Sequence, residues 1–157
     1  MARTVELTTQ LDCTPDEAWA RVGSSDLLRH ITAPLIRFAP DAPGFPRQWQ
    51  VGEYKAWMWL FGVIPLGWQA IVISFPKPRN GTRFVRDNGY GPLIRRWDHW
   101  IEIAPGARPG TTRYTDSVTI EVGFLAPLIA VFARVFYTHR QKRWRRLARE
   151  GFAALRC

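Results

Sequence analysis

Apolar and polar residues alternate in the first part of the chain and again at several later points. Val5, Leu7 and Leu11 are separated by polar residues, and this period of two predicts a strand with one buried face over residues 5–11. Runs of β-branched and aromatic residues predict the remaining strands. These are expected over residues 53–62, 68–75, 82–88, 94–103 and 113–122, with short extended pieces in the irregular segment 31–49.

Turn residues indicate how the strands connect. Asn80-Gly81 is a strong hairpin signal, because both central residues of a type I′ turn need a positive φ, and it is expected to join residues 70–75 to 82–88. Pro65-Leu66-Gly67 predicts a turn in the middle of residues 57–75, a stretch of 19 residues without a charge. That stretch has the length of a membrane span, but a turn between two aromatic, β-branched runs favours a buried hairpin.

Three helices are predicted. Thr14, Pro15 and Glu17 form a capping box with a proline at the first helical position, which begins a short helix. A second short helix is expected over about residues 24–30. From residue 124 apolar residues recur at spacings of three and four, which predicts a long amphipathic helix that runs to about residue 155.

The order of elements is therefore a strand, two short helices, about six antiparallel strands and a long helix. A long helix with one apolar stripe must pack against something, and a curved antiparallel sheet is the partner that this chain offers. We expect an α+β fold in one domain, residues 1–157, with the sheet wrapped around the C-terminal helix.

Positive charge is concentrated at the C-terminus. The chain has 22 Lys and Arg against 13 Asp and Glu, and residues 134–156 hold eight of the bases against one acid. Three interpretations are open: a solvated helix face, docking on an anionic membrane surface through the segment from Arg140 to Arg149, and binding to nucleic acid. No recognised nucleic-acid motif accompanies the basic segment, which argues against the third.

Cofactor and metal chemistry find little support in the sequence. Cys13 and Cys157 lie near opposite ends and form no CxxC pair, and no phosphate-binding loop or dinucleotide fingerprint occurs. We therefore expect no metal and no cofactor. The N-terminus has no apolar run of the kind found in a signal peptide, so we expect a cytoplasmic protein.

The element order, together with five short segments, resembles the SRPBCC superfamily, which includes START domains, polyketide cyclases/dehydrases and plant pollen allergens. The segments are residues 14–19, 91–92, 97–100, 115–118 and 137–144, and they look like those of bacterial members of unassigned function. The resemblance implies a helix-grip fold over essentially the whole chain. Members carry lipids, bind hormones or secondary metabolites, cyclise polyketides or serve as oxygenase domains, so the fold alone selects no activity.

The oxygenase branch of that superfamily needs an iron facial triad. His30, His99 and His139 are scattered along this sequence, with no His-x₄-His spacing. We therefore set the oxygenase branch aside.

Two ionisable residues, His99 and Asp116, fall on otherwise apolar strand faces. Pairing Ile103 with Thr112 across the loop would place His99 directly opposite Asp116, at about 5 Å between Cβ atoms. One interpretation is a catalytic dyad in which Asp116 orients His99 as a general base. The other is a structural pair that joins the two strands, because a buried carboxylate needs a partner in either case.

Aromatic residues are abundant, at 13% of the chain, and could line a cavity between the sheet and the long helix. We expect this cavity to bind a small hydrophobic ligand: a lipid, a polyketide or an aromatic metabolite. The first alternative is a polyketide cyclase/dehydratase-like enzyme that uses the pair of His99 and Asp116, and the second is a peripheral membrane or partner-docking protein. The residues expected to contact the ligand are Trp57, Trp59, Trp97, His99, Asp116, Phe132, Phe136 and His139.

Overall fold

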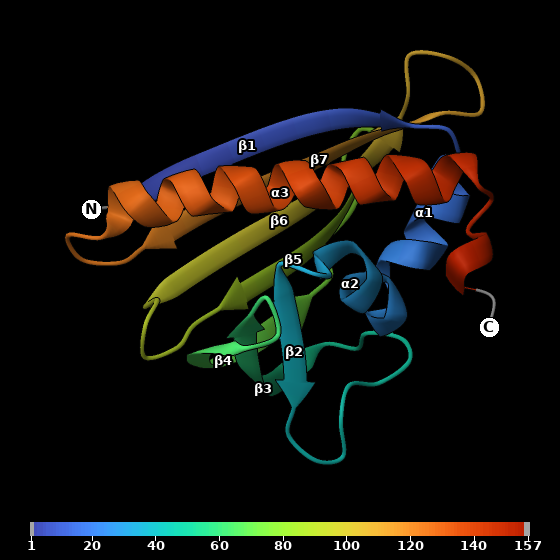
Figure 1. Cartoon of the computed structure of the whole chain (residues 1–157). Helices are drawn as coiled ribbons and strands as arrows, with labels where there is room; N and C mark the ends of the chain where they lie inside the picture. Colours follow the sequence, from blue (N-terminus) through green and yellow to red (C-terminus); the bar gives the residue numbers. More distant parts are fainter. Residues whose placement is uncertain (1, 156–157) are drawn as a thin grey trace.

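The computed structural model describes residues 2–155 (Figure 1). Its elements follow the predicted order of one strand, two short helices, six strands and a long helix. They are β1 (Ala2–Leu11), α1 (Pro15–Val22), α2 (Ser25–Thr32), β2 (Ile36–Pro40), β3 (Gly52–Leu60), β4 (Ile64–Ser74), β5 (Arg83–Gly89), β6 (Arg96–Pro105), β7 (Thr112–Glu121), α3 (Ala126–Arg149) and the short 3₁₀ helix η1 (Ala153–Leu155).

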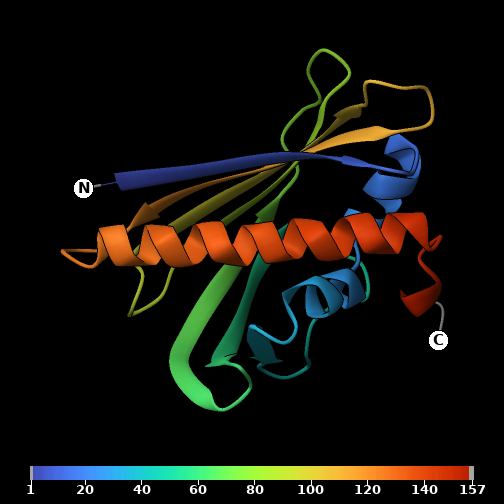
Figure 2. The same cartoon turned by 45° about the horizontal axis from the view of Figure 1, so that its top comes forward.

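The strands form one antiparallel sheet in the order β1-β7-β6-β5-β4-β3-β2. Helix α3 lies across this sheet, and α1 and α2 lie beside the C-terminal half of α3 (Figures 1 and 2). The curved sheet with a long C-terminal helix is the α+β helix-grip architecture that the sequence predicted. Among the described residues, no helix has both the length and the apolar character needed to cross a bilayer.

The predicted capping and turn signals form as expected. Glu17 N–H donates to Thr14 Oγ1 (3.2 Å), and Thr14 N–H donates to Glu17 Oε2 (2.8 Å), which completes the capping box of α1. Asn80 and Gly81 have φ values of 51° and 75°, so the tight turn before β5 has the positive dihedrals that its sequence predicted.

Two element boundaries differ from the prediction. The hairpin of β3 and β4 turns at Phe61-Gly62, where both φ values are positive, and Pro65 to Gly67 lie inside β4. The register shifts between Met58 and Trp59, and this irregularity accommodates Pro65 in the ladder. Helix α3 ends at Arg149, before Gly151, whose φ of 61° is incompatible with a continuing helix.

The predicted register of β6 and β7 is wrong by two residues. Ile103 pairs with Tyr114, and Pro105 pairs with Thr112, because β6 continues through Pro105 before the loop begins. His99 is therefore opposite Val118, and Asp116 is opposite Ile101. The His99 and Asp116 positions are diagonal neighbours on the same face, a spacing that longer side chains still bridge.

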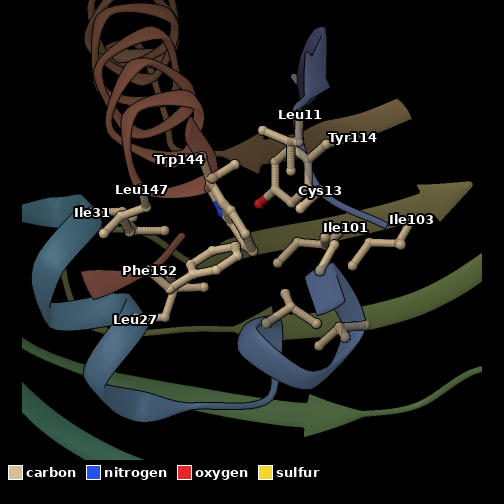
Figure 3. Packing of buried hydrophobic residues seen from close by; sticks show 14 residues of the cluster. Leu11, Cys13, Leu27, Ile31, Ile101, Ile103, Tyr114, Trp144, Leu147 and Phe152 are labelled. Atoms are coloured by element: carbon tan, nitrogen blue, oxygen red, sulfur yellow. The ribbon is translucent and has the colours of Figure 1, made fainter. Parts of the chain in front are cut away.

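One of three clusters of buried hydrophobic residues lies at the C-terminal half of α3, and we call it the Trp144 cluster. Trp144 is fully buried between Tyr114 and Phe152, with ring centroids 5.1 and 6.2 Å away (Figure 3). Helices α1 and α2 close this end of the molecule. The other buried members are Leu11, Cys13, Ala18, Val22, Leu27, Ile31, Val85, Ile101, Ile103, Leu147 and Ala148.

Candidate functional site: a cavity between the sheet and helix α3

A cavity of about 380 Å³ lies between the sheet and the middle of α3 and borders the Trp144 cluster, since Trp144 and Ile101 also line it. Strands β2 to β6 and helices α2 and α3 contribute its walls. Most of the lining side chains are apolar, including Met58 and Leu60 from β3, Ile71 and Ile73 from β4, and Phe132 from α3. The volume lies in the range of small-molecule sites in proteins.

Leu93 and Leu128 mark where the cavity reaches the surface. Both line the cavity, yet their relative exposures are 43% and 65%. Leu93 precedes β6, and Leu128 lies in the first turns of α3. A ligand can therefore enter between the start of α3 and the connection from β5 to β6.

Three ionisable side chains line this apolar cavity: Asp87 from β5, His99 from β6 and Arg140 from α3. Asp87 and His99 are paired across β5 and β6. The cavity therefore has a polar region in an otherwise apolar wall. Such a combination of volume and few polar groups is typical of a site that orients its ligand.

His99 is held by Asp116, which lies behind it. His99 Nε2 is 2.7 Å from Asp116 Oδ1, and both side chains are buried. Burial lowers the pKa of His99, the charge of Arg140 adds to this effect, and the hydrogen bond to Asp116 only partly opposes it. The imidazole is therefore neutral near pH 7, with its proton on Nε2 toward Asp116, which leaves the lone pair on Nδ1.

Asp116 is fully engaged by protein donors. Tyr114 Oη donates to Oδ1 (3.1 Å), and Gln141 Nε2 donates to Oδ2 (3.1 Å), in addition to the His99 contact. Burial by itself would raise the pKa of Asp116, but the hydrogen bond from His99 and the charge of Arg140 hold it below its usual value. Asp116 is therefore ionised and positions His99 without facing the cavity itself.

Arg140 is a buried cation with few partners. It is 5% exposed, and its Nε has no hydrogen-bond partner. The guanidinium carbon lies 5.0 Å from the ring centroid of Tyr137 and 5.8 Å from that of Phe136. Burial opposes its charge, but Asp116 raises the pKa of Arg140, so the guanidinium stays protonated.

Asp87 has an unusual titration. Its Oδ1 accepts a hydrogen bond from Val72 N–H (2.8 Å). Burial nevertheless raises its pKa to about 7, since the Val72 hydrogen bond and the charge of Arg140 only partly offset the loss of hydration. At neutral pH this carboxyl group is therefore present in both the protonated and the ionised form.

Four of the residues predicted to contact ligand line the cavity: Trp97, His99, Phe132 and Phe136. Trp97 Nε1 donates to Tyr137 Oη (2.9 Å), which fixes both rings in the wall. Asp116 is separated from the cavity by His99, as described above.

Trp57, Trp59 and His139, which were also predicted to contact the ligand, do not line this cavity. Met58 and Leu60 face the cavity, so the strand period turns Trp57 and Trp59 to the other face of β3, where Trp57 is 46% exposed. His139 does not line the cavity, because its Nε2 donates to the Ala33 carbonyl (2.7 Å) and joins α3 to the end of α2.

Arg140 and Asp87 are the two lining residues with an acidic or basic side chain, besides His99, that the sequence analysis did not assign to the site. Arg140 was assigned to an exposed basic segment, although it lies four residues after Phe136 and so shares the apolar face of α3. Asp87 lies between Arg86 and Asn88 near a turn, where a carboxylate is normally exposed. Asp87 lies two residues after the buried Val85 and so on the same face of β5, and this spacing was the sequence feature that indicated an inward side chain.

The basic segment that was predicted as a docking surface is divided by the structure. Arg140 faces the cavity, and Arg143 donates to the His30 carbonyl (2.7 Å). The exposed bases are Lys142, Arg145, Arg146 and Arg149. Arg156 and Cys157 lie outside the described residues, and within residues 2–155 no three His, Cys, Asp or Glu side chains are arranged to hold a metal ion.

Solved structures with the same fold come from several organisms. A START superfamily protein from Mycobacterium smegmatis matches with a TM-score of 0.63 at 14% identity, over 94% of this chain and 97% of that chain. A conserved protein from Geobacillus kaustophilus matches with a TM-score of 0.64 at 14% identity, over 94% and 96%. A norcoclaurine synthase point mutant from Thalictrum flavum, in complex with a transition-state analogue, matches with a TM-score of 0.55 at 10% identity. The match covers 91% of this chain and 97% of that chain.

These similarities show a START-like helix-grip fold. Within that fold class, residues 9–150 match the family described as a domain of unknown function (DUF8410), and the chain belongs to this family. No curated protein matches the sequence.

Proposed function

We propose that this protein binds a small hydrophobic ligand in the cavity between the sheet and α3. The observation that carries the proposal is the cavity itself, about 380 Å³ with a largely apolar lining. When an apolar ligand replaces poorly hydrogen-bonded water in an apolar cavity of this size, the free energy falls, which favours binding. The exposed leucines at its mouth, Leu93 and Leu128, give the ligand a route in.

A neutral fluorescent probe tests the proposal without involving the polar groups. N-phenyl-1-naphthylamine is expected to bind saturably, with increased fluorescence. Ile73→Trp places a large side chain in the cavity and should weaken binding at least tenfold, while Val72→Trp, on the opposite face of the same strand, should leave it unchanged. No saturable binding to the wild type, or equal effects of both substitutions, would overturn the proposal.

An enzymatic role is the second candidate, supported by the accessible edge of His99. His99 lines the cavity and has its lone pair on Nδ1, while Asp116 binds its other nitrogen, Nε2. In this arrangement His99 would be the general base and Asp116 the group that orients it. A cyclase or dehydratase would use Nδ1 to remove a proton from a polyketide-like substrate. His99→Asn should then abolish turnover of poly-β-ketone thioester mimics and preserve probe affinity, whereas turnover retained by the variant would rule out this role.

Docking on an anionic membrane is the third candidate, and it depends on the exposed bases of α3. Lys142, Arg145, Arg146 and Arg149 remain exposed after Arg140 and Arg143 are assigned to interior contacts. Sedimentation with anionic and neutral vesicles tests it. Salt-sensitive binding to the anionic vesicles alone supports docking, and equal sedimentation with both excludes it.

A further inference from the structure

Arg140 presents a positive charge to the cavity, and the protein itself does not neutralise that charge by direct contact. Within residues 2–155 no carboxylate lies within ion-pair distance of its guanidinium group. Its contacts are the Tyr114 hydroxyl and the ring faces of Phe136 and Tyr137. A buried cation without a direct counter-ion carries a desolvation penalty of several kcal/mol.

The nearest acidic group is already occupied. Asp116 accepts hydrogen bonds from His99, Tyr114 and Gln141, so three of its roughly four acceptor positions are taken by donors other than Arg140. Asp116 therefore stabilises the charge of Arg140 through space, while Nε of Arg140 remains without a partner. Donor capacity on a planar guanidinium is thus available at the cavity wall.

From this arrangement we infer that the ligand carries a carboxylate, which binds Arg140, with its apolar body lying along Ile71, Ile73 and Phe132. This inference rests on the proposed ligand-binding function and specifies the chemistry of the ligand. A carboxylate matches the fork of a guanidinium and supplies the missing acceptors. Arg140 is the only permanently charged side chain that lines the cavity within the described residues.

The other two ionisable groups in the cavity are compatible with an anion. His99 is neutral, and Asp87 is protonated in a substantial fraction of molecules near pH 7. A protonated Asp87 is itself a hydrogen-bond donor. An amine ligand would instead bind an ionised Asp87 and would be repelled by Arg140, which makes it the informative competitor.

The test compares ligands that share one apolar body and differ in the head group. Dodecanoate, dodecanol and dodecylamine are measured at pH 7 by displacement of N-phenyl-1-naphthylamine. Hydrogen bonds to a charged group contribute about 1.5–3 kcal/mol, so dodecanoate should bind roughly 10 to 100 times more tightly than dodecanol. A parallel pair, 2-naphthoate and 2-naphthol, distinguishes a chain-like body from a planar one.

Substitution of the arginine identifies the group responsible. Arg140→Gln should reduce dodecanoate affinity to that of dodecanol and leave dodecanol affinity unchanged. Lys142→Gln, which removes an exposed base from the same helix, should change neither. If Arg140→Gln fails to fold by circular dichroism, Arg140→Lys keeps the charge without the fork and should give an intermediate preference.

The outcomes separate this inference from the proposed function. If the probe and dodecanol bind but dodecanoate or 2-naphthoate has no advantage over its alcohol, the carboxylate assignment is wrong and hydrophobic ligand binding stands. Tighter binding of dodecylamine, or a carboxylate preference that persists in Arg140→Gln, also overturns the assignment. If neither the probe nor any ligand binds, the proposed function fails as well.

Discussion

The two halves of helix α3 meet the rest of the molecule in opposite ways. Along the C-terminal half, Trp144 and Leu147 belong to a cluster with residues of β1, β7, α1 and α2, and almost nothing of either side chain is exposed. Along the N-terminal half, Phe132 borders the cavity, and Val131 and Val135 are exposed on the outer side. One amphipathic helix thus has a filled half, which packs into the Trp144 cluster, and an open half, which borders the cavity near its mouth; Arg140 and Trp144 of the filled half also line the cavity.

The difference follows from what covers the sheet at each end. Helices α1 and α2 lie beside the C-terminal half of α3, and Phe152, after α3 has ended, packs against Trp144 (Figure 3). In Figure 2 no second helix of the described chain lies beside the N-terminal half of α3. The Trp144 cluster and the cavity share residues, Trp144 and Ile101 among them, whereas Leu147 belongs to the cluster alone and Phe132 only lines the cavity.

The largest expected effect is on the filled half. Trp144→Ala should lower the free energy of unfolding by about 3–5 kcal/mol, because the cavity it leaves cannot collapse. Phe132→Ala, on the open half, should cost only about 1 kcal/mol, since Phe132 already borders empty space. Urea denaturation of the two variants measures both values, and equal losses would contradict the division into filled and open halves.

The second-largest effect on the free energy of unfolding is expected at the buried pair of His99 and Asp116. Asp116→Asn removes the charge that His99, Tyr114 and Arg140 share, and we expect a loss of about 3 kcal/mol in the free energy of unfolding at pH 7. Glu150→Gln is the matched control, because its exposed pair with Arg146 contributes about 0.5 kcal/mol or less. A loss in Asp116→Asn as small as that of the control would show that the buried network adds no stability.

A smaller, pH-dependent effect is expected at Asp87. Its pKa of about 7 lies above the ordinary 3.8, so the folded state holds this proton more tightly than the unfolded state. The stability that it contributes is present at low pH and is lost as pH rises from about 4 to about 7. Asp87→Asn should remove this loss. The free energy of unfolding of the variant, relative to that of the wild type, should therefore increase by about 1–3 kcal/mol between pH 5 and pH 8.

Denaturation at several pH values measures that difference. His99 and Asp116 titrate in both proteins, so their contributions cancel when the variant is compared with the wild type. A stability difference that stays constant from pH 5 to pH 8 would show that Asp87 titrates normally.

The smallest effect concerns affinity for a carboxylate ligand. Asp87 is surrounded by the Val72 amide on β4, Asp98 and His99 on β6, and the charge of Arg140 on α3. Ionisation of Asp87 adds a negative charge to the cavity, so dodecanoate affinity should fall about three- to tenfold as pH rises through 7. Probe displacement at pH 6 and pH 8.5 measures the fall, which should be absent in Asp87→Asn; an equal fall in both proteins would assign it to another group.

Local signals in the sequence predicted much of the fold. The capping box at Thr14 and the turn at Asn80-Gly81 depend on residues adjacent in the chain, and both form. The contact of His99 with Asp116 was also predicted, although through the wrong register. Residues 104–110 do not determine where the flanking strands stop pairing, and a shift of two residues preserves which face each side chain occupies.

The residues that were misplaced share a physical cause. Residues 57–60 are Trp-Met-Trp-Leu, apolar on both faces, so a period of two separates the faces without indicating which one is buried. Arg140 lies among bases that are mostly exposed, and only the position of the sheet turns it inward. Which side of an element faces a cavity depends on tertiary packing, and neither residue type nor local period contains that information.

The most direct test of the account is methyl NMR of the protein labelled at isoleucine Cδ1 and titrated with N-phenyl-1-naphthylamine. Saturable shifts are predicted at Ile71, Ile73 and Ile129, which line the cavity. Ile103, in the Trp144 cluster, and the exposed Ile64 should not move. No saturable shift at Ile71, Ile73 or Ile129, or shifts confined to Ile64, would contradict a ligand site between the sheet and α3.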